Sequence, residues 1–132
     1  MKVKSYLVFN GNAKEVANHY AEILGGKIED LTLYGDCMPD TPEDYKAKVV
    51  HLYLTFDGDA IGMADACPGT QTTFGSGNIV TLHCDTEEQI KSIYEALAKD
   101  GQVRCPLQST FYAKHYADLT DCYGVAWCLI IE

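Results

Sequence analysis

Hydrophobic and polar positions change their period in a regular order at the start of the chain. Residues 3–9 alternate and are rich in strand formers, which predicts a β-strand. Residues 13–24 then place apolar side chains on one face of a helix, and Gly25-Gly26 supplies a left-handed stop after it. Asn12, with Glu15 three residues later, predicts a capping box for the first helical turn. The chain therefore begins with a strand, a turn and a helix.

The same order of patterns returns in the second half. Residues 78–84 are strand-like, and Thr86 with Gln89 predicts a second capping box before another apolar helical stripe. A shift of 74 residues carries Asn12 onto Thr86 and aligns the two helices. We interpret the chain as a single domain that contains an internal repeat, with the domain at residues 1–132 and the repeats at roughly 1–66 and 77–132.

Strand candidates also follow each predicted helix. They span residues 27–34, 48–56 and 60–64 in the first half, and residues 103–107, 112–119 and 125–131 in the second. Each half therefore predicts a βαβββ module. The expected fold class is α+β, in which two modules form a curved mixed sheet around a cavity and the helices lie on the outer face. The polar connections 35–47 and 67–77, which contain prolines, are expected to be loops at the rim of this cavity.

Composition narrows the class of protein and its partners. Apolar residues make up 47% of the chain and charged residues 22%, which is typical of a globular protein. The formal charge of -9 opposes binding to nucleic acid or to an anionic membrane surface, so we expect neither partner. The first residues do not form a signal peptide, and no apolar segment approaches membrane-spanning length. We therefore expect a cytoplasmic protein.

The six cysteines are scattered along the chain without a CxxC pair or a zinc-finger cluster. In a cytoplasmic protein this pattern predicts reduced thiols. We expect most of them to act as small buried apolar residues.

Several segments together resemble a known family. Residues 6–13, followed by His19-Tyr20 and Gly25-Gly26, are similar to the PhnB-like branch of the vicinal-oxygen-chelate superfamily, which includes glyoxalases, bleomycin-resistance proteins and dioxygenases. Residues 48–51, 107–113 and 119–127 continue this resemblance over nearly the whole chain. The resemblance implies a homodimer. One departure is Tyr112-Ala113, where the family usually has Trp-Gly, and it alters the rim of the expected pocket.

The resemblance also implies where a divalent metal would bind. It carries the four ligand positions of the glyoxalase pattern onto Ser5, His51, Ile79 and Cys128. Ile79 offers no donor atom and neutral Ser5 is a poor ligand, so we expect no metal cofactor. Zinc held by His51 and Cys128, with its other ligands supplied by loops or by a partner chain, stays open as an alternative.

Strand alternation predicts which side chains line the expected cavity. It places His51 and Tyr53 on the inner face of their strand, opposite an apolar set that packs on the helix. The same argument adds polar groups from two other strands and aromatic walls from a loop. The expected ligand-binding residues are His51, Tyr53, Thr81, His83, Phe111, Tyr112 and Cys128.

Two functional classes follow from these residues. The first is a metal-free protein that binds a small organic molecule in a cup lacking the usual metal site, by stacking a planar or cationic ligand on aromatic walls. The second is a lyase, isomerase or dioxygenase of the glyoxalase type with an altered metal site. A His51 base that activates the Cys128 thiol would be the catalytic pair of a metal-free enzyme. Some relatives are described as ubiquinone methyltransferases, but this chain has no Gly-rich strand-to-helix turn for a methyl donor.

Overall fold

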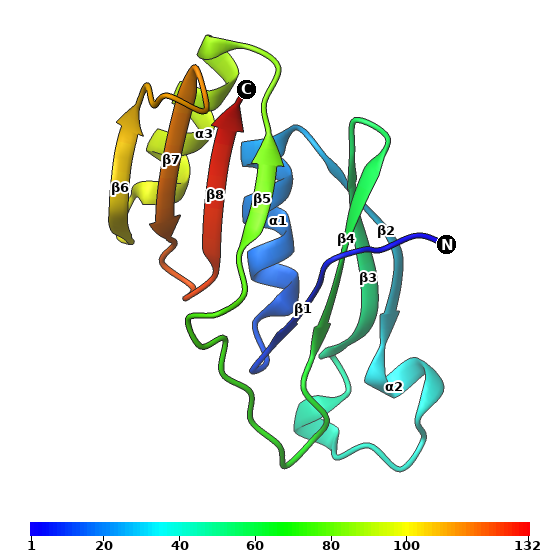
Figure 1. Cartoon of the computed structure of the whole chain (residues 1–132). Coiled ribbons are helices and arrows are strands. Elements are labelled where there is room, and N and C mark those ends of the chain that lie inside the picture. Colours follow the sequence, from blue (N-terminus) through cyan, green and yellow to red (C-terminus); the bar gives the residue numbers. More distant parts are fainter. The chain divides into compact units, whose positions relative to one another are not determined.

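The computed structural model describes all 132 residues, and the chain divides into two compact units, Met1–Thr73 and Phe74–Glu132. Each unit contains one strand, one long helix and then three strands, as Figure 1 shows. The prediction of two βαβββ modules and of the α+β class is therefore confirmed. The expectation of one cavity enclosed by both halves concerns their relative placement and stays a prediction.

The first unit is a four-stranded mixed sheet with α1 on one face. Its strands follow the order β1-β4-β3-β2, in which β1 is parallel to β4 and the other pairs are antiparallel. Helix α1 contacts β2, β3 and β4. The elements are β1 (Tyr6–Phe9), α1 (Ala13–Leu24), β2 (Lys27–Leu33), α2 (Tyr34–Cys37), the 3-10 turn η1 (Glu43–Tyr45), β3 (Val49–Phe56) and β4 (Asp59–Asp65).

The second unit repeats this topology. Its strands follow the order β5-β8-β7-β6, with β5 parallel to β8, and α3 contacts β6, β7 and β8 (Figure 1). The elements are β5 (Val80–His83), α3 (Glu87–Ala98), β6 (Gln102–Gln108), β7 (His115–Thr120) and β8 (Ala126–Ile131). Neither long helix has the length and hydropathy needed to cross a lipid bilayer.

A hydrophobic core lies between the helix and the sheet in each unit. Leu52 and Leu54 of β3 are fully buried in the first unit, as are Trp127 and Leu129 of β8 in the second. Burying one such side chain typically stabilises a fold by about 1.5–3 kcal/mol. Because side chains alternate along a strand, the other face of each sheet carries the remaining residues, and we call it the open face of that unit.

The two helices begin in different ways. Thr86 Oγ1 accepts a hydrogen bond from Gln89 N at 3.1 Å, which confirms the predicted cap of α3. At α1 the predicted capping box is wrong, because Asn12 makes no side-chain cap hydrogen bond. Asp65, at the end of β4, caps α1 instead: its Oδ1 accepts from Ala13 N at 2.9 Å and from Gly11 N at 3.0 Å.

The repeat is less regular than a single shift of 74 residues. The helices are related by 74 residues, since α1 begins at residue 13 and α3 at residue 87. The strands are related by 73, because Leu7 and Phe9 pair with helix-facing residues of β4 as Val80 and Leu82 pair with those of β8. One extra residue before α3 accounts for the difference. Ile79 therefore corresponds to Tyr6, and its expected equivalence with Ser5 is wrong.

The long connection between β2 and β3 contains structure that its polar sequence does not predict. It includes α2 and η1, and Tyr34 Oη donates a hydrogen bond to the Asp65 carbonyl at 3.0 Å. The Tyr45 hydroxyl likewise donates to the Ala66 carbonyl. These two hydroxyls attach the connection to the end of β4.

Strand β7 begins later than the sequence predicts. It starts at His115 and not at residue 112, because Thr110 and Ala113 close a turn. Thr110 N donates to the Ala113 carbonyl at 2.9 Å, and Ala113 N donates to Thr110 Oγ1 at 3.1 Å.

The cysteines form no disulfide, but the expectation that most are buried is wrong. Cys37, Cys67 and Cys122 are exposed, and the other three are partly exposed. The exposed three lie in connections between strands, where few side chains cover them, and Cys128 lies on the open face of β8.

Candidate functional site

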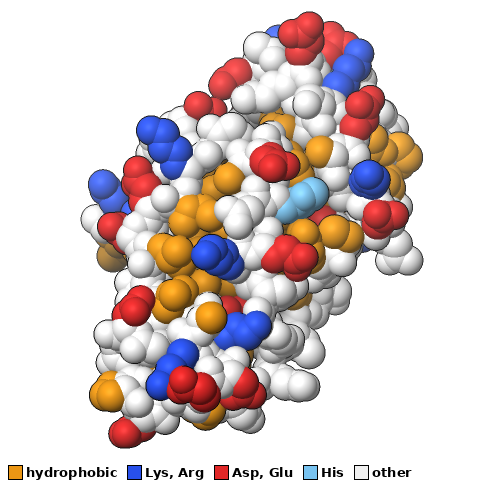
Figure 2. All heavy atoms as spheres, turned by 180° about the vertical axis from the view of Figure 1, so that it is seen from behind, with side chains coloured by type: hydrophobic (Ala, Val, Ile, Leu, Met, Phe, Trp, Pro, Cys, Tyr) orange, Lys and Arg blue, Asp and Glu red, His pale blue; other side chains and the backbone are white.

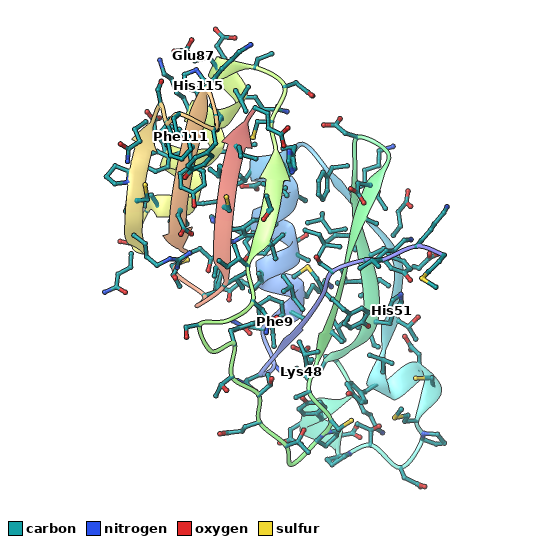
Figure 3. The ribbon with its side chains drawn as sticks, in the orientation of Figure 1. Phe9, Lys48, His51, Glu87, Phe111 and His115 are labelled. Atoms are coloured by element: carbon teal, nitrogen blue, oxygen red, sulfur yellow. The ribbon has the colours of Figure 1, made fainter.

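The open face of the first unit carries two of the predicted site residues. Leu52 and Leu54 are buried toward α1, so His51 and Tyr53 lie on the opposite face of β3, as alternation predicts. Figure 3 shows His51 on this strand. The alternation fails at Val49, which is fully buried. A register shift between the pairs Thr32 with His51 and Leu33 with Val49 explains this.

Three aromatic side chains meet on this face, and we call Tyr6, His51 and Tyr53 the aromatic cluster. Tyr6 Oη and His51 Nδ1 are 2.8 Å apart, and the two rings are stacked with centroids 5.8 Å apart. The rings of His51 and Tyr53 meet edge to face at 4.5 Å. His51 thus lies between two phenols that come from two strands, β1 and β3.

Gly62 of β4 makes room for Tyr6. The two residues are direct neighbours in the β1–β4 pairing, and a Cβ atom at residue 62 would lie 2.3 Å from Tyr6 Cδ2. No side chain therefore fits at Gly62 while the Tyr6 ring keeps this position. The absence of a side chain allows the ring to lie on the sheet with its hydroxyl at His51.

The protonation of the cluster follows from its environment. Burial raises the pKa of Tyr6 above its ordinary value, and the neighbouring Tyr53 raises it further. Tyr6 is therefore a neutral phenol near pH 7, and its O–H donates to His51 Nδ1. A neutral imidazole that accepts at Nδ1 carries its proton on Nε2, and an imidazolium carries protons on both nitrogens. His51 Nε2 is then an N–H donor in either state.

Charged side chains surround one end of the cluster. The Lys4 ammonium lies 4.9 Å from the centroid of the Tyr53 ring, which is cation–π geometry. Glu29 is the cross-strand neighbour of Tyr53 on β2. An open depression of about 900 Å³ adjoins these residues, and its lining includes Lys2, Lys4, Lys27, Glu29 and Thr55.

The other predicted site residues belong to the second unit. Thr81 and His83 lie exposed on β5, and Thr81 pairs directly with Cys128 of β8. The His83 imidazole is already engaged, because its Nδ1 lies 3.3 Å from a carboxylate oxygen of Glu132. Within this unit Thr81 and Cys128 are therefore brought together, whereas His83 is paired at the end of its strand.

Cys128 has a partner that the sequence did not indicate. The Tyr116 hydroxyl and the Cys128 thiol form a side-chain hydrogen bond. Burial raises the pKa of Tyr116 to about 12, and burial also raises the pKa of the Cys128 thiol. Because the thiolate is the nucleophile and the metal ligand, a thiol that stays protonated is poorly suited to either role. The pairing of Cys128 with His51, which belongs to the other unit, stays a prediction.

Aromatic side chains lead from the β6–β7 connection to Cys128. Phe111 is 100% exposed and Tyr112 is 53% exposed. Their ring centroids are 5.0 Å apart, and Tyr112 is 5.5 Å from Tyr116, both in edge-to-face geometry. Figure 3 labels Phe111 in this connection. A small open depression of about 290 Å³ lies beside Phe111 and Tyr112.

The expected metal positions do not provide a metal site. In the strand pairing, Thr81 with Cys128 corresponds to Val8 with Ala64, so the counterpart of Cys128 is Ala64 and not His51. The four equivalent positions are Tyr6, Ala64, Ile79 and Cys128, which include neither an imidazole nor a carboxylate. Within neither unit do three His, Cys, Asp or Glu side chains gather to hold a metal ion. These residues do not fit a glyoxalase-type divalent metal.

Sequence reasoning missed Tyr6, Gly62 and Tyr116. Tyr6 had a signal, because it alternates with Leu7 and Phe9, which face the helix. Gly62 and Tyr116 had none, since their contacts depend on which strands pair and in which register.

Charge on the protein surface is mixed. Figure 2 shows acidic and basic side chains interspersed on the face seen from behind, without a large region of positive charge. This face therefore has no basic patch of the kind that binds nucleic acid.

Comparison with known proteins places the chain in a family. A family model described as 3-demethylubiquinone-9 3-methyltransferase matches residues 1–130. Protein YjdN of Escherichia coli K12 is 26% identical over 98% of this chain and 94% of its own length. Protein PA1353 of Pseudomonas aeruginosa has a crystal structure that is 32% identical, covers 100% of this chain and 98% of its own, and superposes with a TM-score of 0.89. The PhnB protein of Bacillus cereus is 28% identical with full coverage of both chains and a TM-score of 0.83. The chain therefore belongs to this 3-demethylubiquinone-9 3-methyltransferase family, a PhnB-like branch of the vicinal-oxygen-chelate superfamily.

Proposed function

We propose that this protein binds a small planar organic molecule on the open face of its first unit, with the aromatic cluster as the contact surface. The single observation that supports the proposal most strongly is the placement of His51 between Tyr6 and Tyr53, with a donor at Nε2 that has no partner within the protein. An apolar ring surface with one oriented polar group is the arrangement that small-molecule sites commonly use.

The stacking surfaces explain why the ligand should be planar. Aromatic side chains favour offset-stacked and edge-to-face contacts, which add about 0.5–1.5 kcal/mol per pair beyond the burial of area. Tyr6 is 48% exposed, so one side of its ring is available to a ligand. The remaining predicted site residues, Thr81, His83, Phe111, Tyr112 and Cys128, are proposed as further contacts from the second unit.

The proposal does not include methyl transfer or metal catalysis. Each unit is a four-stranded sheet with one long helix on one face, which differs from the doubly wound sheet that holds a nucleotide-type methyl donor. The glyoxalase ligand set is absent from the equivalent strand positions, as described above. Binding is therefore the function that these residues support best.

Histidine-selective NMR tests the proposal directly. The chain has four histidines, so a ¹³C-histidine-labelled sample gives four ring signals, which His51→Gln assigns. We expect a planar aromatic ligand from a mixed compound collection to shift the His51 signal and to leave those of His19 and His115 in place. If no planar compound at millimolar concentration moves the His51 signal, the proposal is wrong.

A pair of tyrosine variants provides the control. Tyr53→Leu removes one ring of the cluster and should weaken binding about tenfold or more, in line with the loss of a buried aromatic contact. Tyr94→Leu changes a partly exposed tyrosine on α3 and should leave binding unchanged. Equal effects of the two variants would contradict the assignment of the site.

We further propose that the protein is a cytoplasmic homodimer, following the expectation from its family resemblance. Light scattering coupled to size-exclusion chromatography measures the mass against the 14.6 kDa of one chain. A mass of one chain at micromolar concentration would reject the dimer.

A further inference from the structure

The polar groups of the aromatic cluster that remain available to a ligand are hydrogen-bond donors. Tyr6 uses its own proton in the bond to His51 Nδ1, and the pKa of Tyr6 is raised, so this phenol does not become an acceptor anion near pH 7. That bond leaves a proton on His51 Nε2, which has no partner within the protein. The nearby Lys4 ammonium contributes N–H donors and no acceptor.

The Lys4 ammonium also affects which charge a ligand can carry. It occupies a face of the Tyr53 ring, with its nitrogen 4.9 Å from the ring centroid. A cationic ligand that stacks on this ring would have to displace the ammonium and would be repelled by it. An anionic ligand meets an opposite charge at the same place.

We infer that the ligand of this site is a planar organic anion, such as an aromatic carboxylate, whose oxygens accept hydrogen bonds from His51 Nε2 and the Lys4 ammonium while its ring stacks on the cluster. The inference deepens the proposed function and depends on it. It assigns Lys4 as a charge-recognition residue and Tyr6 as a positioning residue that fixes the proton of His51 on Nε2.

One nearby carboxylate opposes this ligand and makes the inference sharper. Glu29 lies opposite Tyr53 in the β2–β3 pairing and forms no ion pair with Lys4. Its negative charge should weaken the binding of an anion and strengthen that of a cation. Glu29→Gln should therefore tighten anion binding, and Lys4→Met should weaken it.

The test compares three probes that share one ring system and differ in charge. They are 2-naphthoate, 2-naphthamide and 2-naphthylmethylammonium, each titrated into the full-length ¹³C-histidine-labelled protein with the His51 signal as the readout. We expect 2-naphthoate to bind at least about tenfold more tightly than the ammonium compound, since hydrogen bonds to charged groups are the stronger ones. Lys4→Met should reduce this preference several-fold, and Glu29→Gln should increase it.

The outcomes separate the inference from the proposed function. If the ammonium probe binds as tightly as naphthoate, or if Lys4→Met leaves the preference unchanged, the anion is the wrong ligand class although the site still binds planar molecules. If none of the three probes moves the His51 signal, the proposed function fails, and the inference fails with it.

A spectroscopic readout tests the positioning role of Tyr6 without any ligand. The ¹⁵N shifts of the neutral His51 ring should report the Nε2–H tautomer in the unmodified protein. In Tyr6→Phe the Nδ1–H tautomer should become populated, and naphthoate binding should weaken. An Nδ1–H tautomer in the unmodified protein would overturn the donor assignment.

Discussion

Asp65 offers a direct test of how the first unit is stabilised. Its side chain is only 3% exposed, and its two oxygens accept hydrogen bonds from three backbone N–H groups. Oδ1 accepts from Gly11 and Ala13 at the start of α1, and Oδ2 accepts from Val49 N at 2.9 Å. One carboxylate therefore joins the helix, β3 and β4, and its negative charge lies at the helix N-terminus, where the macrodipole favours it.

The expected loss of stability can be estimated from these three bonds. Asp65→Ala leaves three N–H groups without their acceptor, at about 1–3 kcal/mol for each group that stays dry. Because water enters part of the space, we expect a total of about 3–6 kcal/mol, a large share of the 5–15 kcal/mol typical of a domain. Asp65→Asn keeps one acceptor oxygen for Gly11 and Ala13 but turns an amide N–H₂ toward Val49 N, so its loss should be about 1–3 kcal/mol.

Urea denaturation followed by far-UV circular dichroism measures both variants. Asp40→Asn is the matched control, because it also removes one negative charge but from an exposed position, and it should change stability by less than about 0.5 kcal/mol. Amide hydrogen exchange gives a local readout, since Ala13 and Val49 should lose protection. The reasoning is refuted if Asp65→Ala lowers the free energy of unfolding by less than about 1 kcal/mol, or if Asp65→Asn costs as much as Asp65→Ala.

Three further predictions concern other parts of the chain. Thr86→Ala removes the side-chain cap of α3 and should lower the unfolding free energy by about 1 kcal/mol in the same urea assay, whereas Asn12→Ala should have a clearly smaller effect, because Asn12 makes no cap bond; similar losses would contradict the two caps. Burial raises the pKa of the Cys84 thiol from 9 to about 11, so the folded state holds a proton that the unfolded chain releases, and the thiol's contribution to stability is complete below pH 9 and declines as the pH rises to about 11. Cys84→Ala should reduce the fall in melting temperature over this interval, and an unchanged pH profile would argue against a buried neutral thiol. Zinc, nickel, manganese or iron should leave the melting temperature unchanged, since a site at 100 times its Kd would add about 2.7 kcal/mol; a specific rise with any of them would reopen the metal-dependent alternative.

The order of elements could be predicted because it depends on local patterns. The alternation at residues 49–56 and the helical stripes are properties of neighbouring residues, and burial of one face then fixes the two βαβββ modules. The Thr86 cap was also predictable, since its donor is only three residues away. His51 and Tyr53 were correctly placed opposite the helix for the same local reason.

The contacts that define the candidate site depend on how distant strands pair, and the tertiary structure decided them. Tyr6 meets His51 although 45 residues separate them in the sequence, because β1 pairs with β4 and β4 with β3. Asp65 replaces Asn12 as the cap of α1 for the same kind of reason. A one-residue difference before α3 moved the expected repeat out of register and selected Tyr6 instead of Ser5. Since side chains alternate every residue along a strand, a shift of one residue moves a side chain to the other face, and the sequence alone does not reveal such a shift.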